Sequence, residues 1–160
     1  MSLDPRTPVL VGAAAVSQRS DDPFEGRSAI GLMTWACETA ADDAGSRDLL
    51  RAAQLIAVPT GTWRHDNAAA AVARGLGNTG ARTVRAEVGV LQTTLFRRAA
   101  DAIASGGLDV SIVVGGEAKW RDLRATIAGV TLPEDEPSGP PDEVLSPHDS
   151  IIAKEEIDAG

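Results

Sequence analysis

The stretch from Arg82 to Gly116, RTVRAEVGVLQTTLFRRAADAIASGGLDVSIVVGG, contains the pattern that decides the fold. Apolar and polar residues alternate over Thr83–Val88, which predicts a strand with one polar side. Apolar residues then recur at helical spacing over Leu91–Ile103, and a glycine pair separates this helix from the apolar run Val110–Val114. The stretch therefore predicts a strand, a tight turn, a helix and a second strand.

Upstream of this stretch the chain carries two more apolar runs that are typical of strands. Val9–Val16 is continuously apolar, and Leu55–Val58 is a shorter run that ends before a proline. Continuous apolar runs of this kind predict strands buried on both faces. Because Thr83–Val88 alternates while the other runs do not, it is expected at the edge of the sheet.

Two helices are predicted between these strands. Apolar positions recur at helical spacing from Ser28 to Ala44, and Gly45 follows as a C-cap glycine. Asn67 is a good N-cap for the alanine-rich segment Ala68–Leu76. The resulting order, βαβαβαβ, predicts an α/β fold with a mostly parallel sheet flanked by helices.

The rhythm of strands and helices ends at about residue 117. Residues 1–117 are interpreted as one α/β domain, and residues 118–160 as an excursion rich in proline and acid that closes with a short helix over Ser150–Ala159. No strand is predicted after that helix, so the chain is interpreted as a fragment whose natural end is not fixed by Gly160.

The composition restricts the function classes. The chain has 160 residues, 3% aromatic residues and a formal net charge of −8. The core must therefore be built from Ala, Val, Leu and Ile, and a nucleic-acid partner is disfavoured because phosphate binding needs a basic surface. Neither a membrane-spanning apolar run nor a signal peptide is recognisable, and the single cysteine forms no internal disulfide, so we expect a cytoplasmic protein.

Two motifs are interpreted as structural. The string GLGNTG at Gly75–Gly80 matches the dinucleotide pattern G-x-G-x-x-G, but it closes a helix and precedes a strand, which is the reverse of the order that the cofactor needs. It is therefore read as a cap and a turn. Cys37 lies on the apolar face of the first helix, where packing is the better interpretation than catalysis.

The loop that follows Leu55–Val58 contains polar residues at the expected ligand-binding edge of the sheet. His65 stands beside Asp66, which can orient an imidazole ring, and Arg64 can meet a phosphate. Neighbouring loop residues often point apart, however, and no nucleophile is close in sequence. A structural or subunit-contact role is favoured for this loop.

The turn EVGVLQ at Glu87–Gln92 stands at the start of a helix, where the partial positive charge lowers the pKa of a thiol. Some acyl-transfer enzymes place a nucleophile at such a turn. Neither Cys nor Ser occurs among these six residues. The turn at which such enzymes place a nucleophile is therefore predicted, but the nucleophilic side chain is missing.

Taken together, these motifs resemble the thiolase superfamily, in the branch of sterol-carrier-type thiolases, over about Pro8–Glu117. The similarity rests on VLVGAA at Val9–Ala14, AADDAG at Ala40–Gly45, AIASG at Ala102–Gly106 and VVGGE at Val113–Glu117. The resemblance implies one of two similar halves in layers αβαβα. It also implies a homodimer or heteromer formed through the edge strand, here Thr83–Val88.

The resemblance further implies that the family's acyl-accepting cysteine corresponds to Gly89, so no catalytic residue is identified in this chain and no metal is expected. Val88, Gly89, Val90 and His65 are the candidates for residues next to a substrate. The family's catalytic histidine and second cysteine belong to a C-terminal half outside this similarity.

By resemblance, the function is that of an acyl-CoA acyltransferase of the acetyl-CoA acetyltransferase type, in lipid metabolism, with altered or lost activity. Coenzyme A thioesters are the implied substrates, and no covalently bound cofactor is expected. The alternative is a non-catalytic acyl-CoA-binding or scaffold subunit that pairs with an active partner.

Overall fold

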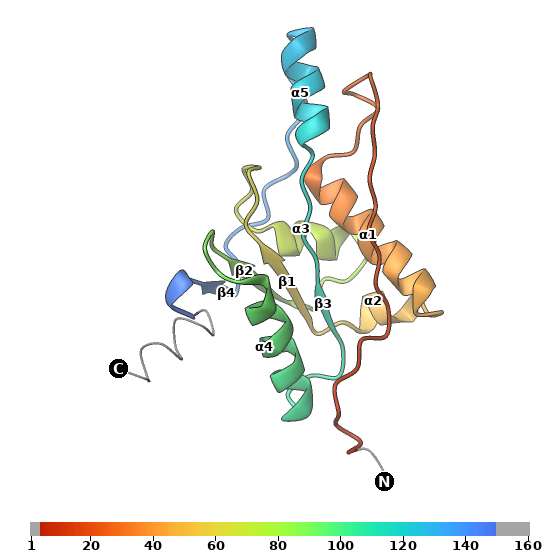
Figure 1. Ribbon diagram of the computed structural model, residues 1–160, viewed down its shortest axis with the longest axis vertical. Helices are drawn as coiled ribbons and strands as arrows, with labels where there is room; N and C mark the ends of the chain where they lie inside the picture. The colour runs from red at the N-terminus through yellow and green to blue at the C-terminus, as the bar shows by residue number, and fades with distance from the viewer. Residues whose placement is uncertain (1–3, 150–160) are drawn as a thin grey trace.

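The computed structural model describes residues 4–149, which form a parallel sheet with helices on both faces (Figure 1). No helix in this part of the chain has the length and apolarity needed to cross a membrane. The elements are, in order, α1 (Ala29–Asp43), α2 (Asp48–Ala52), β1 (Leu55–Pro59), α3 (Ala68–Gly75), β2 (Arg82–Ala86), α4 (Gln92–Ala104), β3 (Ser111–Val113), α5 (Lys119–Ala128), β4 (Glu143–Leu145) and the 3₁₀ turn η1 (Pro147–Asp149).

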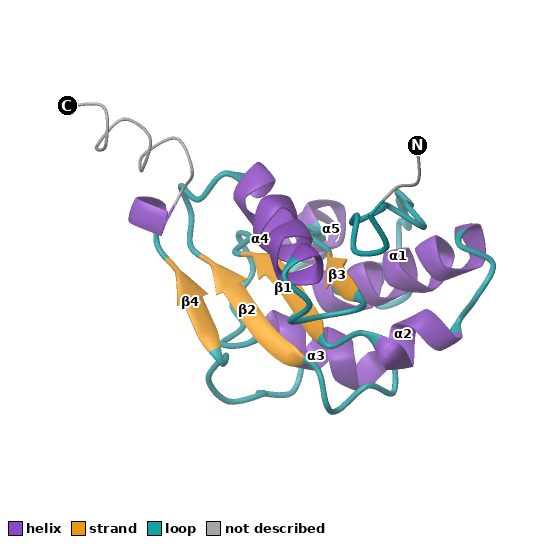
Figure 2. Ribbon diagram, turned by 90° about the horizontal axis from the view of Figure 1, so that it is seen from below, coloured by secondary structure: helices purple, strands orange, loops and turns teal. Residues whose placement is uncertain are grey.

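The sheet has the strand order β3-β1-β2-β4, and every neighbouring pair is parallel. Ala57 of β1 lies opposite Val84 of β2 on one side and Val113 of β3 on the other. Helix α4 covers one face, and α1 and α3 lie on the other (Figure 2). The predicted α/β class with a mostly parallel sheet is confirmed.

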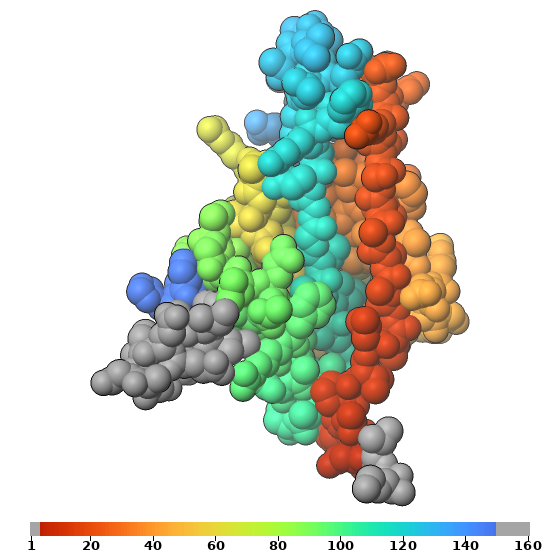
Figure 3. All heavy atoms as spheres, in the orientation of Figure 1, coloured from red at the N-terminus to blue at the C-terminus, as the bar shows by residue number. Residues whose placement is uncertain are grey.

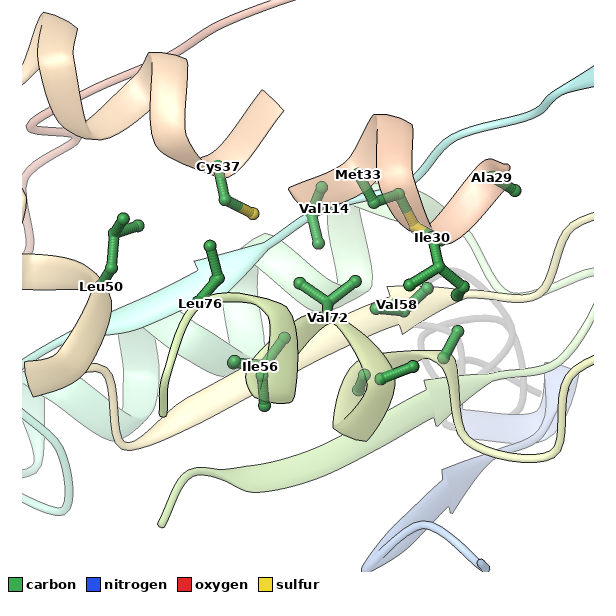
Figure 4. Packing of buried hydrophobic residues seen from close by; sticks show 14 of the residues in the cluster. Ala29, Ile30, Met33, Cys37, Leu50, Ile56, Val58, Val72, Leu76 and Val114 are labelled. Atoms are coloured by element: carbon green, nitrogen blue, oxygen red, sulfur yellow. The ribbon is translucent and has the colours of Figure 1, made fainter. Parts of the chain in front are cut away.

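Alternate residues of β1 point into two separate apolar clusters. Ile56 and Val58 pack with α1 and α3, whereas Leu55 and Ala57 pack under α4. Figure 4 shows the first cluster, in which Val72 of α3 lies among side chains from α1 and β1. A strand buried on both faces by apolar residues is the pattern that the run Leu55–Val58 predicted.

Helices α1 and α3 approach each other closely because their contact residues are small. A Cβ atom added to Gly75 would lie 3.0 Å from the Thr34 side chain of α1. The predicted caps are also present: the Asn67 side chain accepts a hydrogen bond from the N–H of Ala70, and Gly77 has a φ of +69° after the end of α3. The interpretation of Gly75–Gly80 as a cap and a turn is confirmed.

The prediction of a buried strand at Val9–Val16 was wrong. This segment is extended but belongs to no strand, and Val9 and Leu10 are 69% and 79% exposed. It runs along α1, where a Cβ added to Gly12 would lie 2.2 Å from the carbonyl oxygen of Ala40. The segment packs closely against helix α1 and forms no hydrogen-bonded ladder with a neighbouring strand. Its apolar side chains therefore remain open to solvent.

The prediction that Thr83–Val88 is an edge strand was also wrong. β2 lies between β1 and β4, and the strand itself ends at Ala86. The residues of β4 come from the proline- and acid-rich region, which also contains α5. The predicted helix Ser150–Ala159 lies outside the described residues.

The polar side of β2 has partners inside the molecule. The Thr83 N–H and hydroxyl both donate to Asp142 Oδ2, at 2.7 and 2.8 Å, and the Asn67 side-chain amide donates to the Thr83 hydroxyl at 3.2 Å. Arg85 donates to the carbonyl oxygen of Asp66 at 3.3 Å. The alternation of apolar and polar residues in β2 is therefore explained by polar contacts inside the molecule. It does not require Arg85 to pair with a second copy of the chain.

The acid sensitivity of the fold is expected to depend on Asp142. The N–H and hydroxyl of Thr83 lower the pKa of this carboxyl group. Because its pKa is lower in the folded state than in the unfolded state, the stabilisation is complete above the ordinary carboxyl pKa and is lost as the pH falls through the lowered value. Asp142→Asn should reduce the free energy of unfolding by about 1 kcal/mol at pH 7. In urea unfolding, the difference from wild type should shrink at acid pH.

The matched control for this prediction is Glu134→Gln in the same acidic segment, where the side chain is exposed. It removes one negative charge without removing the acceptor of the Thr83 hydrogen bonds. Equal losses for Asp142→Asn and Glu134→Gln would show that net charge, and not the hydrogen bonds to Thr83, causes the effect.

Candidate functional site

A cavity of about 300 Å³ opens at the carboxyl edge of the sheet, where open α/β proteins bind ligands. The loop after β1, the first turns of α4 and the end of β3 form its walls. Its lining residues are Pro59, Thr60, Gly61, Gln92, Leu95, Phe96, Val113, Val114, Gly115, Gly116 and Glu117.

Two hydrogen-bonded contacts hold the loops after β1 and β3 together beside this cavity. The Glu117 carboxylate accepts from the N–H of Thr62 at 2.8 Å and from its hydroxyl at 2.7 Å. The Trp63 indole N–H donates to the carbonyl oxygen of Gly116 at 2.8 Å. Because both loops are fixed by these bonds, one side of the cavity is built before any ligand binds.

Thr60 supplies a polar group without a partner at this edge. Its hydroxyl oxygen is buried and makes no hydrogen bond to any residue in the described part of the chain. Buried hydroxyl groups normally have a partner.

The predicted substrate-adjacent residues Val88, Gly89 and Val90 form the turn that leads into α4. The N–H of Val90 donates to the carbonyl oxygen of Glu87 at 3.1 Å, and Val88 is 76% exposed. Gly89 has a φ of +103°, a conformation that side chains rarely adopt, and an added Cβ would lie 3.1 Å from Pro147 Cγ. Both the backbone and the neighbouring proline therefore oppose a side chain at residue 89.

The fourth candidate, His65, has its contacts with a different segment. The side chain is only 4% exposed; Nδ1 accepts from the N–H of Asn67 at 3.1 Å, and Nε2 donates to the carbonyl oxygen of Glu136 at 3.1 Å. Both ring nitrogens are thus used to join the loop after β1 to the acidic segment. These contacts support the structural role favoured for this loop, and none of them links His65 to the turn at Val88–Val90.

The cavity-lining residues Thr60, Gln92 and Phe96 were not identified from the sequence. Thr60 follows β1 immediately and Gln92 is the first residue of α4. Both positions lie at the carboxyl edge, so the rule that ligands bind there was the available signal.

The parallel sheet flanked by helices, with a cavity at its carboxyl edge, places the chain in the class of open α/β proteins. The structure matches the crystal structure of a monomeric SCP2-thiolase-like protein type 1 from Mycobacterium smegmatis, with 30% sequence identity and a TM-score of 0.51. The match covers 66% of this chain and 22% of the solved chain, so the chain spans about a fifth of that protein. This match bears out the resemblance of the chain to thiolase-like proteins. No family model and no curated protein matches it.

The conformation of Gly89 leads to a stability prediction. Gly89→Ala should lower the free energy of unfolding by about 1–3 kcal/mol, because alanine is strained at this φ and its Cβ contacts Pro147. Gly80→Ala is the control, since Gly80 lacks a left-handed φ and has no heavy atom within 4 Å of an added Cβ. Urea unfolding of both variants gives the comparison, and equal stabilities would contradict the strain.

Cys37 is expected to be unreactive in the folded protein. Burial, and then the neighbouring Glu38 charge, raise its pKa to about 12, so almost no thiolate forms near neutral pH. Labelling with a disulfide reagent at pH 8 should be at least about tenfold slower in the native state than in guanidinium chloride. Equal labelling rates would show that Cys37 is accessible and that its assignment to the packed core is wrong.

Proposed function

We propose that the chain provides the N-terminal half of a thiolase-like protein and binds an acyl-CoA thioester without holding the acyl group covalently. The observation that carries the proposal is Gly89. By resemblance it stands where the family has its acyl-accepting cysteine, and its φ of +103° disfavours a side chain, as does Pro147 Cγ at 3.1 Å from an added Cβ. Without a nucleophilic side chain at that position, residue 89 forms no acyl-enzyme.

The cavity at the strand ends suits the thioester end of such a ligand. Leu95, Phe96 and Val113 offer apolar contacts to an acyl group, and the Thr60 hydroxyl offers a hydrogen bond. Neither Arg nor Lys occurs among the lining residues. The phosphates of coenzyme A would therefore lie outside this cavity, in solvent or against another part of the protein.

A second candidate is an acyltransferase whose reacting groups come from outside these residues. The observation that favours it is the coverage of the solved thiolase-like chain, of which only 22% is matched. In this case the present cavity would bind the substrate, and a nucleophile from elsewhere would form the acyl intermediate.

We also propose that β2 does not serve as the contact between two copies. The outer side of β2 is paired with β4, and Leu145 of β4 is 2% exposed. Pairing with a second copy would first require that β4 leave the sheet. The solved relative is described as monomeric, which agrees with this proposal.

The proposal predicts non-covalent binding that depends on the cavity. Isothermal titration with acetyl-CoA and with its unreactive thioether analogue should give similar affinities. Thr60→Val should weaken both about twofold to tenfold, because one hydrogen bond is lost without a change of shape. Thr79→Val is the control, since Thr79 is exposed and lies outside this cavity.

The mass of the protein after incubation with acetyl-CoA tests whether this chain holds the acyl group covalently. An unchanged mass supports binding without covalent chemistry, whereas an added acetyl group would overturn it. If neither ligand binds, the assignment of acyl-CoA to this cavity is wrong.

A further inference from the structure

A cavity of about 130 Å³ lies between the loop that precedes α1 and the start of α5. We call it the Arg121 cavity. Its walls come from the loop 16–27, from Leu32 of α1 and from residues 117–121. Figure 3 shows this loop, in orange-red, against α5, in cyan, at the top of the molecule. The Arg121 cavity shares only Glu117 with the acyl-CoA cavity proposed above, so it is a separate site.

Two hydrogen bonds attach the loop 16–27 to α5 beside this cavity. The Trp120 indole N–H donates to the carbonyl oxygen of Ser20 at 3.0 Å. One residue further along the loop, the carbonyl oxygen of Asp21 accepts from Arg124 Nε at 3.1 Å. The two walls are therefore joined by the chain itself, and the cavity is formed before any ligand binds.

The guanidinium group of Arg121 lacks a partner in this cavity. Its Nε is buried and makes no hydrogen bond in the described part of the chain. The stem of the side chain is held by the loop, because a Cβ added to Gly26 would lie 3.1 Å from Arg121 Cγ. A guanidinium group is always charged in proteins, and a buried N–H donor without an acceptor is costly. A negatively charged acceptor beside Nε would remove this cost.

The acidic residue that lines the cavity does not supply this acceptor. Both carboxylate oxygens of Glu117 accept hydrogen bonds from Thr62, and Glu117 forms no ion pair with Arg121 among the described residues. A second cation, Arg27, also lines the cavity and lies over the Trp35 ring, at 5.2 Å from its centroid. No side chain caps the first turn of α5, whose partial positive charge adds to that of the arginines. The charges around the cavity therefore favour an anion.

The remaining walls indicate which kind of anion fits. Val16, Leu32 and Ala118 offer apolar contacts, and the volume admits only a small molecule. A phosphate group carries more charged oxygens than one guanidinium can satisfy. A carboxylate, in contrast, pairs with the two parallel N–H groups that Nε and one Nη of a single arginine present. A small carboxylate with an alkyl group meets both the charge and the apolar walls.

We propose that the Arg121 cavity binds a short-chain aliphatic monocarboxylate. The carboxylate pairs with Nε and one Nη of Arg121, and the alkyl group packs against Val16, Leu32 and Ala118. The bound anion joins the loop 16–27 to α5 more firmly than the two hydrogen bonds do alone. This inference does not depend on the binding of acyl-CoA.

An NMR titration of the whole chain with propionate tests the proposal at the atom concerned. The Arg121 Nε–H signal, assigned by its absence in Arg121→Lys, should shift and reach saturation, because Nε gains a charged acceptor. Propionamide has nearly the same shape but no charge, so it should bind at least about tenfold more weakly.

A matched pair of variants locates the binding, which is followed at the Gly26 N–H signal. Arg121→Lys should weaken propionate binding at least about tenfold, because lysine keeps the charge but loses the planar pair of donors. Arg124→Lys makes the same change three residues later in α5, outside the cavity, and should alter the affinity by less than about twofold.

Three results would overturn the proposal. An Arg121 signal that stays in place up to about 0.1 M propionate, well above a millimolar Kd, would show that no carboxylate binds. Tighter binding of inorganic phosphate than of propionate would make the cavity a general oxyanion site. Equal weakening by Arg121→Lys and Arg124→Lys would show that the attachment of the loop, and not the Arg121 donors, controls binding. None of these results affects the Thr60→Val comparison, so this proposal and the proposed function can fail separately.

Discussion

The hydroxyl group of Thr83 is the contact on which the arrangement of the sheet depends. It donates to Asp142, accepts from the side-chain amide of Asn67 and accepts again from the N–H of Asp142. Three segments therefore meet at one buried oxygen: β2, the start of α3 and the chain that enters β4. The segment with many prolines and acidic residues is held at this point, and β4 is placed beside β2.

Small side chains impose the second constraint on the molecule. With few aromatic residues, the core gains its apolar contacts from the close approach of alanine-rich helices to the sheet. Gly75 against Thr34 and Gly12 against Ala40 show how near the backbones lie. The same closeness holds the N-terminal segment on α1, where it belongs to no strand of the described sheet.

The candidate functional site combines a prepared cavity with a turn, Glu87–Gln92, that contains neither Cys nor Ser. Glu117 and Trp63 fix the loops around the cavity, and α4 begins beside it. At the turn before α4, however, the chain adopts a backbone conformation that suits glycine. Under the proposed function, the fixed walls of the cavity would orient the thioester. The turn itself contains no cysteine from which a thiolate could form.

Local features of the sequence were enough to predict α1, α3 and α4, the strands β1, β2 and β3, the caps at Asn67 and Gly45, and the burial of Cys37. Periodicity and capping act over a few residues, so they can be read along the chain. Neighbours in the sheet are decided by contacts between distant residues. β4 has only three residues, and the bond that directs it joins Thr83 to Asp142, which are 59 residues apart.

The two wrong strand predictions, for Val9–Val16 and Thr83–Val88, also arise because contacts between distant residues decide the outcome. The apolar run Val9–Val16 predicts that its side chains are buried, but it does not identify the element that would bury them. The alternation in Thr83–Val88 predicts that one side of the strand is polar. It does not predict that Asn67, Asp66 and Asp142 are the hydrogen-bond partners of that side. Tertiary packing alone decided the strand order, the exposure of Val9–Val11 and the position of Thr60 beside the cavity, because each depends on which distant segments meet.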